Sequence, residues 1–179
     1  MLEINEDNIK KKLNLFFDQG NFDEVIKFSK FLLKKHPSNS TLYLIMGVAY
    51  INLKNYKSGE KQLKKSIKLN PNNPNAYNDL GVCLINLKKY EEAIFNLEKS
   101  IQLQNFYPEA YNNIGLAYQN KGDTENAILN YEISIKQNPK YAKALSNLGL
   151  LMTDINEINK AIKHLVNAIE ADQNSQSSW

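Results

Sequence analysis

Residues 77–81 read Tyr-Asn-Asp-Leu-Gly, and a stretch of this kind returns at a constant interval along the chain. The other copies are Tyr-Leu-Ile-Met-Gly at 43–47, Tyr-Asn-Asn-Ile-Gly at 111–115 and Leu-Ser-Asn-Leu-Gly at 145–149. Their glycines, Gly47, Gly81, Gly115 and Gly149, are 34 residues apart each time. A constant period of this length is typical of proteins built from repeated supersecondary units.

The same register divides the whole chain into repeats without any insertion. The predicted repeats are 6–39, 40–73, 74–107, 108–141 and 142–175, which form one array over residues 1–179. Residues 176–179 would start a sixth repeat, with Trp179 in the phase of its leading aromatic residue. The first repeat departs most from the pattern, because Lys12 and Leu13 stand where an apolar residue and a glycine belong.

Each repeat contains two apolar runs of helical length with a short polar break between them. Pro74 and Pro108 are expected to begin first helices, where no amide donor is needed. Asn21 and Asp123 are expected to cap second helices through their side chains. A glycine inside a helix costs up to about 1 kcal/mol relative to alanine. We therefore expect the two helices of each pair to cross closely at the repeated glycine.

This pattern resembles the tetratricopeptide repeat (TPR), which combines a 34-residue period with Trp-x2-Leu-Gly-x2-Tyr, then Ala-x3-Phe, then a proline. The fourth repeat matches it at Tyr111, Ile114, Gly115, Tyr118, Ala127, Tyr131 and Pro139. The resemblance covers nearly the whole chain. It implies an all-α fold, an α-solenoid of five helix-turn-helix repeats wound into a right-handed superhelix, because one hairpin cannot bury its apolar stripe alone.

The resemblance also implies a function, namely that of a scaffold that binds a protein or an extended peptide in a concave groove lined by the first helices. The candidate peptide-binding residues are the first-helix positions that the core does not use: Leu44, Ile45, Val48, Ile51, Asn78, Asp79, Val82, Ile85, Asn112, Asn113, Leu116 and Asn147. Contiguous exposed apolar residues often mark an interaction site, and an amide side chain can pair with a peptide unit.

The asparagines of this set are similar to the asparagine row that lines the TPR superhelix of the O-GlcNAc transferases. Ile45 and Asp79 interrupt that row. Asn52, Asn86 and Asn120 form another row with the same period. Two alternatives stay open: the apolar side chains pack on neighbouring first helices, and the asparagines are ordinary solvated polar residues.

Chaperone-binding TPR domains hold a C-terminal carboxylate with a lysine, two asparagines and basic residues from three repeats. Lys10 and Asn14 match the first pair of that motif, but Ile45 replaces the second asparagine. Asn75 and Asp79 replace the basic residues, and an aspartate would repel a carboxylate. We therefore predict that the chain has no carboxylate clamp.

Composition argues against several other classes of function. The net charge is +3, and all 22 basic residues are lysines, whereas guanidinium groups are the usual ligands of phosphate; we expect no nucleic-acid partner. Cys83 shares the phase of Ala49 and Ala117 and is expected to be a small buried residue. No nucleophile motif, acid–base pair, phosphate loop or metal-ligand cluster is visible, so we expect neither an enzyme nor a cofactor or metal.

The sequence shows no secretory signal and no run of about 18 apolar residues, so we expect a cytoplasmic protein without a membrane span. Residues 1–73 carry a net charge of +6 and residues 74–179 a net charge of −3, which could favour head-to-tail contact. Two alternative functions stay open. One is an oligomerisation unit that associates through an open C-terminal end, and the other is the N-terminal recognition arm of a larger enzyme.

Overall fold

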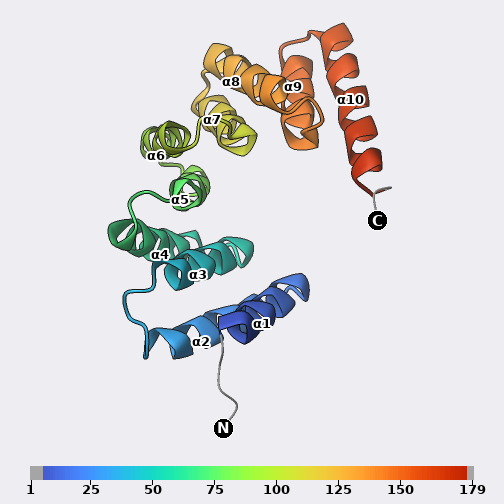
Figure 1. The fold of residues 1–179 in the computed structure, drawn as a ribbon. Helices are drawn as coiled ribbons and strands as arrows, with labels where there is room; N and C mark the ends of the chain where they lie inside the picture. Colours follow the sequence, from blue (N-terminus) through green and yellow to red (C-terminus); the bar gives the residue numbers. More distant parts are fainter. Residues whose placement is uncertain (1–5, 177–179) are drawn as a thin grey trace. The chain divides into compact units, whose positions relative to one another are not determined.

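The computed structural model describes residues 6–176, and all the regular structure within them is α-helical (Figure 1). The helices are α1 (Glu6–Asp18), α2 (Phe22–Leu33), α3 (Ser40–Asn52), α4 (Tyr56–Leu69), α5 (Pro74–Asn86), α6 (Tyr90–Leu103), α7 (Pro108–Lys121), α8 (Thr124–Gln137), α9 (Ala142–Asp154) and α10 (Ile158–Gln176). The predicted all-α solenoid of helix-turn-helix repeats is confirmed. The handedness of the superhelix and the repeat boundaries stay predictions, and Trp179 lies outside the described residues.

The chain forms two compact units, Met1–Leu87 with α1 to α5 and Lys88–Trp179 with α6 to α10. In the first unit, α2 packs against both α1 and α3, and α4 packs against both α3 and α5. In the second unit, α8 lies in the same way between α7 and α9, and α10 packs against α9. Within the units, α2, α4 and α8 therefore each contact their own first helix and the next one, as in a stacked repeat array.

The cores of the two units consist of aliphatic and aromatic residues from both helices of each pair. The first unit buries Leu13, Val25, Ile26, Leu32, Leu42, Met46 and Ala49, and the second buries Ala127, Tyr131, Leu148, Leu151, Met152 and Ala161. Cys83 is fully buried, as predicted. Burial, assisted by the charges of Asp79 and Glu60, raises the pKa of its thiol to about 12.

The repeated glycines leave room for a large side chain of the second helix. A Cβ atom on Gly47 would lie 2.5 Å from Cγ of Leu63, and one on Gly149 would lie 2.8 Å from Cδ2 of Leu165. On Gly115 it would lie 2.7 Å from Cδ1 of Tyr131. These distances confirm a close helix crossing at the glycines.

The helix starts agree with the prediction at three of the four positions considered. Pro74 and Pro108 begin α5 and α7, and the Asp123 side chain accepts a hydrogen bond from the Asn126 backbone N–H at 3.2 Å. The prediction for Asn21 is wrong, because its side chain makes no cap hydrogen bond to α2. Its Nδ2 donates to Oε1 of Gln19 at 3.0 Å, a contact that uses the donor of the amide and not the oxygen that a cap requires.

The turn between the two helices of a pair places one residue in the left-handed region. These residues are Gly20, Lys54, Lys88, Gly122 and Asn156, with φ between 56° and 88°. Glycine adopts this conformation readily, whereas a side chain on Cβ makes it less favourable. The five turns therefore share one geometry, but this geometry is less favourable where the residue is not glycine.

Two serines link a second helix to the beginning of the first helix of its pair. Ser66 Oγ donates to the Ser40 carbonyl at 2.9 Å, and Ser134 Oγ donates to the Pro108 carbonyl at 2.8 Å. Ser100 has the same phase and is also fully buried, but its Oγ has no hydrogen-bond partner among the described residues. Nothing in the repeat pattern separates these three serines.

Replacing Ser134 with alanine is expected to lower the free energy of unfolding by about 1 kcal/mol, because a buried hydrogen bond is lost. Ser100→Ala is the matched control and is expected to be neutral or stabilising, because its hydroxyl is buried without a partner among residues 6–176. Urea unfolding followed by circular dichroism measures both. An equal loss in the two variants would contradict the assigned role of the hydrogen bond.

Candidate functional site

The candidate residues of the first unit lie on two neighbouring first helices that contact each other, α3 and α5. We call them the α3/α5 face: Leu44, Ile45, Val48 and Ile51 on α3, and Asn78, Asp79, Val82 and Ile85 on α5. Asn78 and Ile85 are each only 7% exposed, and the other side chains are half-buried. The face is thus partly accessible. The burial of Ile85 agrees with the alternative that the apolar side chains pack on neighbouring helices.

Charge is scarce on the α3/α5 face. Helix α3 contains no charged residue, and Asp79 is the single charged residue of α5. Burial raises the pKa of Asp79 to about 6, although a hydrogen bond from Asn78 acts in the opposite direction. At neutral pH the face therefore carries one poorly solvated carboxylate in otherwise uncharged surroundings.

A pocket of about 450 Å³ adjoins this face at Ile45 and lies between α1, α2 and α3. Its apolar lining is Ile9, Leu13, Leu32, Leu42 and Ile45, and its polar lining is Lys10, Asn14, His36, Asn39 and Thr41. The Asn39 side chain is already engaged, because its Oδ1 accepts the backbone N–H of Leu42 at 3.1 Å. The lining contains no carboxylate, so the pocket suits an apolar group with a neutral or negative polar edge.

Sequence reasoning missed this pocket. Its signal was the departure of the first repeat from the pattern, where Leu13 replaces the glycine at which the helices of other pairs cross. Lys10 and Asn14, which match the first pair of a carboxylate clamp, line the pocket together with His36 from the loop after α2. The predicted absence of a clamp stays a prediction.

The second unit contains a separate surface, the α7/α9 face, formed by Asn112, Asn113 and Leu116 on α7 and Asn147 on α9. Asn147 Nδ2 donates to Oδ1 of Asn112 at 2.9 Å, and Asn112 Nδ2 lies 3.5 Å from Oδ1 of Asn113. Asn112 is only 3% exposed. The amides therefore tie α7 to α9, and the half-buried Asn113, Leu116 and Asn147 remain accessible in part.

The second asparagine row serves its own helices. Asn52, Asn86 and Asn120 each donate Nδ2 to the carbonyl four residues earlier, at distances of 2.8 to 2.9 Å. All three are exposed near the end of a first helix. One N–H of each amide is thus already used, which favours the interpretation that these asparagines satisfy carbonyl groups near the ends of their own helices.

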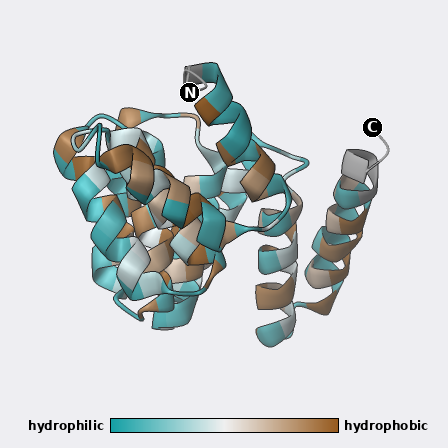
Figure 2. Cartoon of the chain, turned by 90° about the horizontal axis from the view of Figure 1, so that it is seen from below, coloured by the Kyte–Doolittle hydropathy of each residue, from teal (hydrophilic) through white to brown (hydrophobic). Residues whose placement is uncertain are grey.

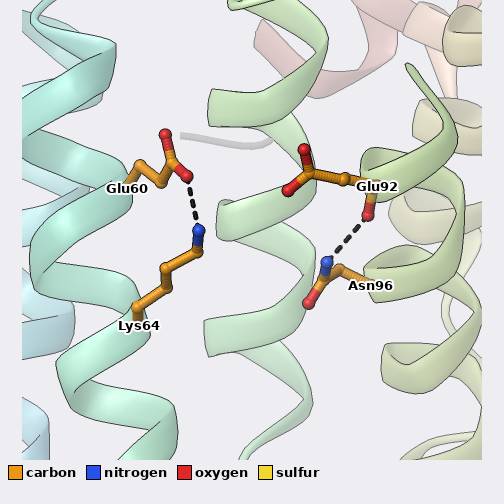
Figure 3. Close-up of polar contacts among 4 residues, drawn as sticks. All are labelled: Glu60, Lys64, Glu92 and Asn96. Atoms are coloured by element: carbon orange, nitrogen blue, oxygen red, sulfur yellow. Dashed lines mark hydrogen bonds and ion pairs between the residues drawn. The ribbon is translucent and has the colours of Figure 1, made fainter. Parts of the chain in front are cut away.

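The second helices α4 and α6 carry polar contacts between residues four positions apart. Lys64 forms an ion pair of 2.6 Å with Glu60 on α4, and on α6 Asn96 Nδ2 donates to the Glu92 carbonyl at 2.7 Å (Figure 3). The basic residues of α4 and Tyr43 line a shallow hollow, with Lys65 Nζ 5.8 Å from the Tyr43 ring centre. Exposed lysines with a carboxylate nearby make a weak anion site.

Among residues 6–176, no three His, Cys, Asp or Glu side chains gather in a way that could hold a metal ion. None of the helices in this part of the chain is both long and apolar enough to cross a membrane. His36 is exposed, and burial together with the charge of Lys163 lowers the pKa of His164.

Three family models match the sequence. The model of anaphase-promoting complex (cyclosome) subunit 3 matches residues 18–100, a TPR repeat model matches 84–122, and a tetratricopeptide repeat model matches 108–141. No curated protein matches the sequence significantly.

Many solved structures resemble the fold. MamA is similar with 27% identity and a TM-score of 0.76, and the match covers 92% of this chain and 96% of MamA. TTC0263 from Thermus thermophilus shares 16% identity with a TM-score of 0.82, covering 93% of this chain and 91% of that one. YrrB shares 22% identity with a TM-score of 0.67, covering 95% and 88%. Both of the latter are described as TPR proteins.

Proposed function

Because the chain belongs to the tetratricopeptide-repeat family, and is in this sense a protein-interaction scaffold, we propose that its α3/α5 face and the adjoining pocket bind an extended segment of a partner protein. The pocket is the observation that carries this proposal. It combines an apolar lining with a few polar groups beside a half-buried aliphatic surface. This combination is typical of sites that anchor one side chain of a ligand.

The chemistry of the surface defines the kind of segment. The pocket accepts one aliphatic or aromatic side chain, because Leu13, Leu32 and Leu42 line it. The residues of the segment that lie against α3 are uncharged, since a charge there would lose its water without gaining a partner. A lysine or arginine of the segment pairs with Asp79, whose carboxylate is poorly solvated.

The α7/α9 face offers a second, separate surface of a different character. Asn113 and Asn147 are half-buried amides beside Leu116, and such amides donate to and accept from a peptide main chain. We propose main-chain contacts for this face and side-chain selection for the pocket. YrrB, which is described as having an unusual peptide-binding site, supports the fold of such a module and not these residues.

The test of this proposal is peptide binding by the purified chain, measured with a library of extended peptides and followed by calorimetry on the best binder. Thr41→Phe fills the exposed rim of the pocket, and Val48→Asp puts a charge on the α3/α5 face. Each is expected to weaken binding by at least about tenfold, which corresponds to about 1.4 kcal/mol.

The controls make the same chemical changes at exposed positions away from the pocket. Asn72→Phe lies in the loop before α5, and Leu129→Asp lies on α8, where the side chain is 52% exposed. Both are expected to bind as tightly as the parent chain. Failure to select any peptide, or equal binding by Thr41→Phe, Val48→Asp and the parent, would refute the proposal.

A further inference from the structure

Helix α10 carries an apolar stripe on the side that faces away from its buried residues. Ile158, Ile162, Val166 and Ile169 are 47%, 56%, 46% and 58% exposed, and steps of three and four residues place them on one face. Ala161, Ala168 and Ala171 on the same helix are buried. In Figure 2, brown bands alternate with teal ones along the helix that leads to the C-terminal label. A helix with two apolar faces buries the second one against another element.

The surface formed by α1 and α2 differs, because a charge covers aromatic residues of both helices. Lys12 Nζ lies 4.7 Å from the ring centre of Phe28 and 5.7 Å from that of Phe16. Packing α10 of another molecule against this surface would bury the ammonium group of Lys12, which is costly. The stripe of α10 therefore does not suit head-to-tail contact with α1.

We propose that the α10 stripe packs against the α10 stripe of a second copy of this chain, with the two helices antiparallel about a two-fold axis. The charges beside the stripe support this arrangement. Lys163 and Glu170 are seven residues apart and so lie on the same flank of the helix. When Ile162 of one copy lies opposite Ile169 of the other, Lys163 of each copy comes within reach of Glu170 of the other.

The antiparallel direction follows from the order of the charges along α10. In a parallel pair the flank that carries Lys163 and Glu170 would lie beside the opposite flank of the partner helix, where Ala161 and Ala168 are buried, so the two charges would gain no partner. The antiparallel pair brings the two charged flanks together and gives two identical attractive contacts, as an isologous interface requires. The pairing uses no residue of the α3/α5 face, so a loss of peptide binding would leave it intact.

Sedimentation equilibrium of the full 179-residue chain is the first measurement, and a reversible dimer is the expected result. Ile162→Asp is expected to weaken the dimer at least about a hundredfold, because a carboxylate would be buried in the pair. Phe95→Asp on α6 is the matched control, since Phe95 is 67% exposed and lies off the stripe. A monomer at every concentration, or an Ile162→Asp chain that dimerises like the parent, would overturn the proposal.

A charge exchange tests the direction of the pair. Lys163→Glu and Glu170→Lys are each expected to weaken the dimer by about threefold to tenfold, and the double variant is expected to restore it. Failure of the double variant to recover would overturn the antiparallel register.

Thiol crosslinking tests the antiparallel arrangement independently. In a Cys83→Ala background, Val166→Cys places one thiol of each copy near the two-fold axis, and copper-catalysed oxidation by oxygen is expected to join them as a disulfide. Ile158→Cys lies far from the axis and is expected to crosslink poorly. Preferential crosslinking at position 158 would overturn the antiparallel arrangement.

Trp179, the single tryptophan of the chain, reports on a competing occupant of the stripe. In the proposed pair, Ile162→Asp does not change the tryptophan emission of dilute, monomeric protein. A blue-shifted emission in the monomer that Ile162→Asp moves to the red would show that a segment of the same chain covers the stripe, which would overturn the second-copy proposal.

Discussion

Replacing Gly115 with alanine is expected to lower the free energy of unfolding by about 2–3 kcal/mol, although alanine is the better helix former. The new Cβ would lie 2.7 Å from both Cδ1 and Cε1 of Tyr131. Tyr131 is fully buried, and its hydroxyl donates to Oε1 of Gln119 at 2.6 Å, so the ring is held at both ends and cannot move aside. Chemical denaturation measures the loss.

The matched control for Gly115→Ala removes the ring that it meets. In a Tyr131→Ala background the same substitution is expected to be neutral, or stabilising by up to about 1 kcal/mol, because only the helix propensity of alanine remains. The two costs define a double-mutant cycle. An equal cost in both backgrounds would show that the close approach of Gly115 and Tyr131 is not the cause.

Replacing Asp79 with asparagine is expected to raise the free energy of unfolding at neutral pH by up to about 3 kcal/mol. The folded chain holds the pKa of this carboxyl at about 6 instead of the ordinary 3.8, chiefly through burial. The folded state therefore binds the proton more tightly than the unfolded state does. Stability from this group is full below pH 3.8, falls as the pH rises to about 6, and stays lost above it.

Urea unfolding at a series of pH values reads this effect as the difference between Asp79→Asn and the parent. The difference is expected to appear between pH 3.8 and about 6 and to stay constant above that range. Asp23→Asn on the exposed side of α2 is the control and is expected to give no comparable difference. A less stable Asp79→Asn chain at neutral pH would mean that the carboxylate is compensated in the folded state.

The parts of the fold that the sequence predicts are those with a strict steric requirement. A glycine at positions 47, 115 and 149 reflects a lack of space for Cβ, and such a requirement recurs at the repeat period. The helix starts at Pro74 and Pro108 follow from the geometry of proline in the same way. Requirements of this kind hold whatever the surrounding residues are.

The candidate site was less predictable, because it depends on competition between similar contacts. An asparagine bonds equally well to a peptide or to another asparagine, and the sequence does not reveal that Asn147 donates to Asn112. Nor does it reveal that Asn21 donates to Gln19 and makes no cap hydrogen bond to α2. The pocket beside Ile45 lies where the repeat pattern fails, so the periodicity marks its place and predicts neither its shape nor its lining.

The left-handed turn residues influence which helical hairpins unfold locally most often. Lys54 holds a φ of 56°, which costs a residue with a Cβ atom about 1 kcal/mol or more relative to glycine, whereas Gly122 holds 88° without that cost. In an array whose repeats contact mainly their neighbours, such strain stays local. The α3–α4 hairpin is therefore biased toward transient opening relative to α7–α8. The conformation of the turn residue thus sets how readily a hairpin opens locally, and it does so without any change in the binding faces.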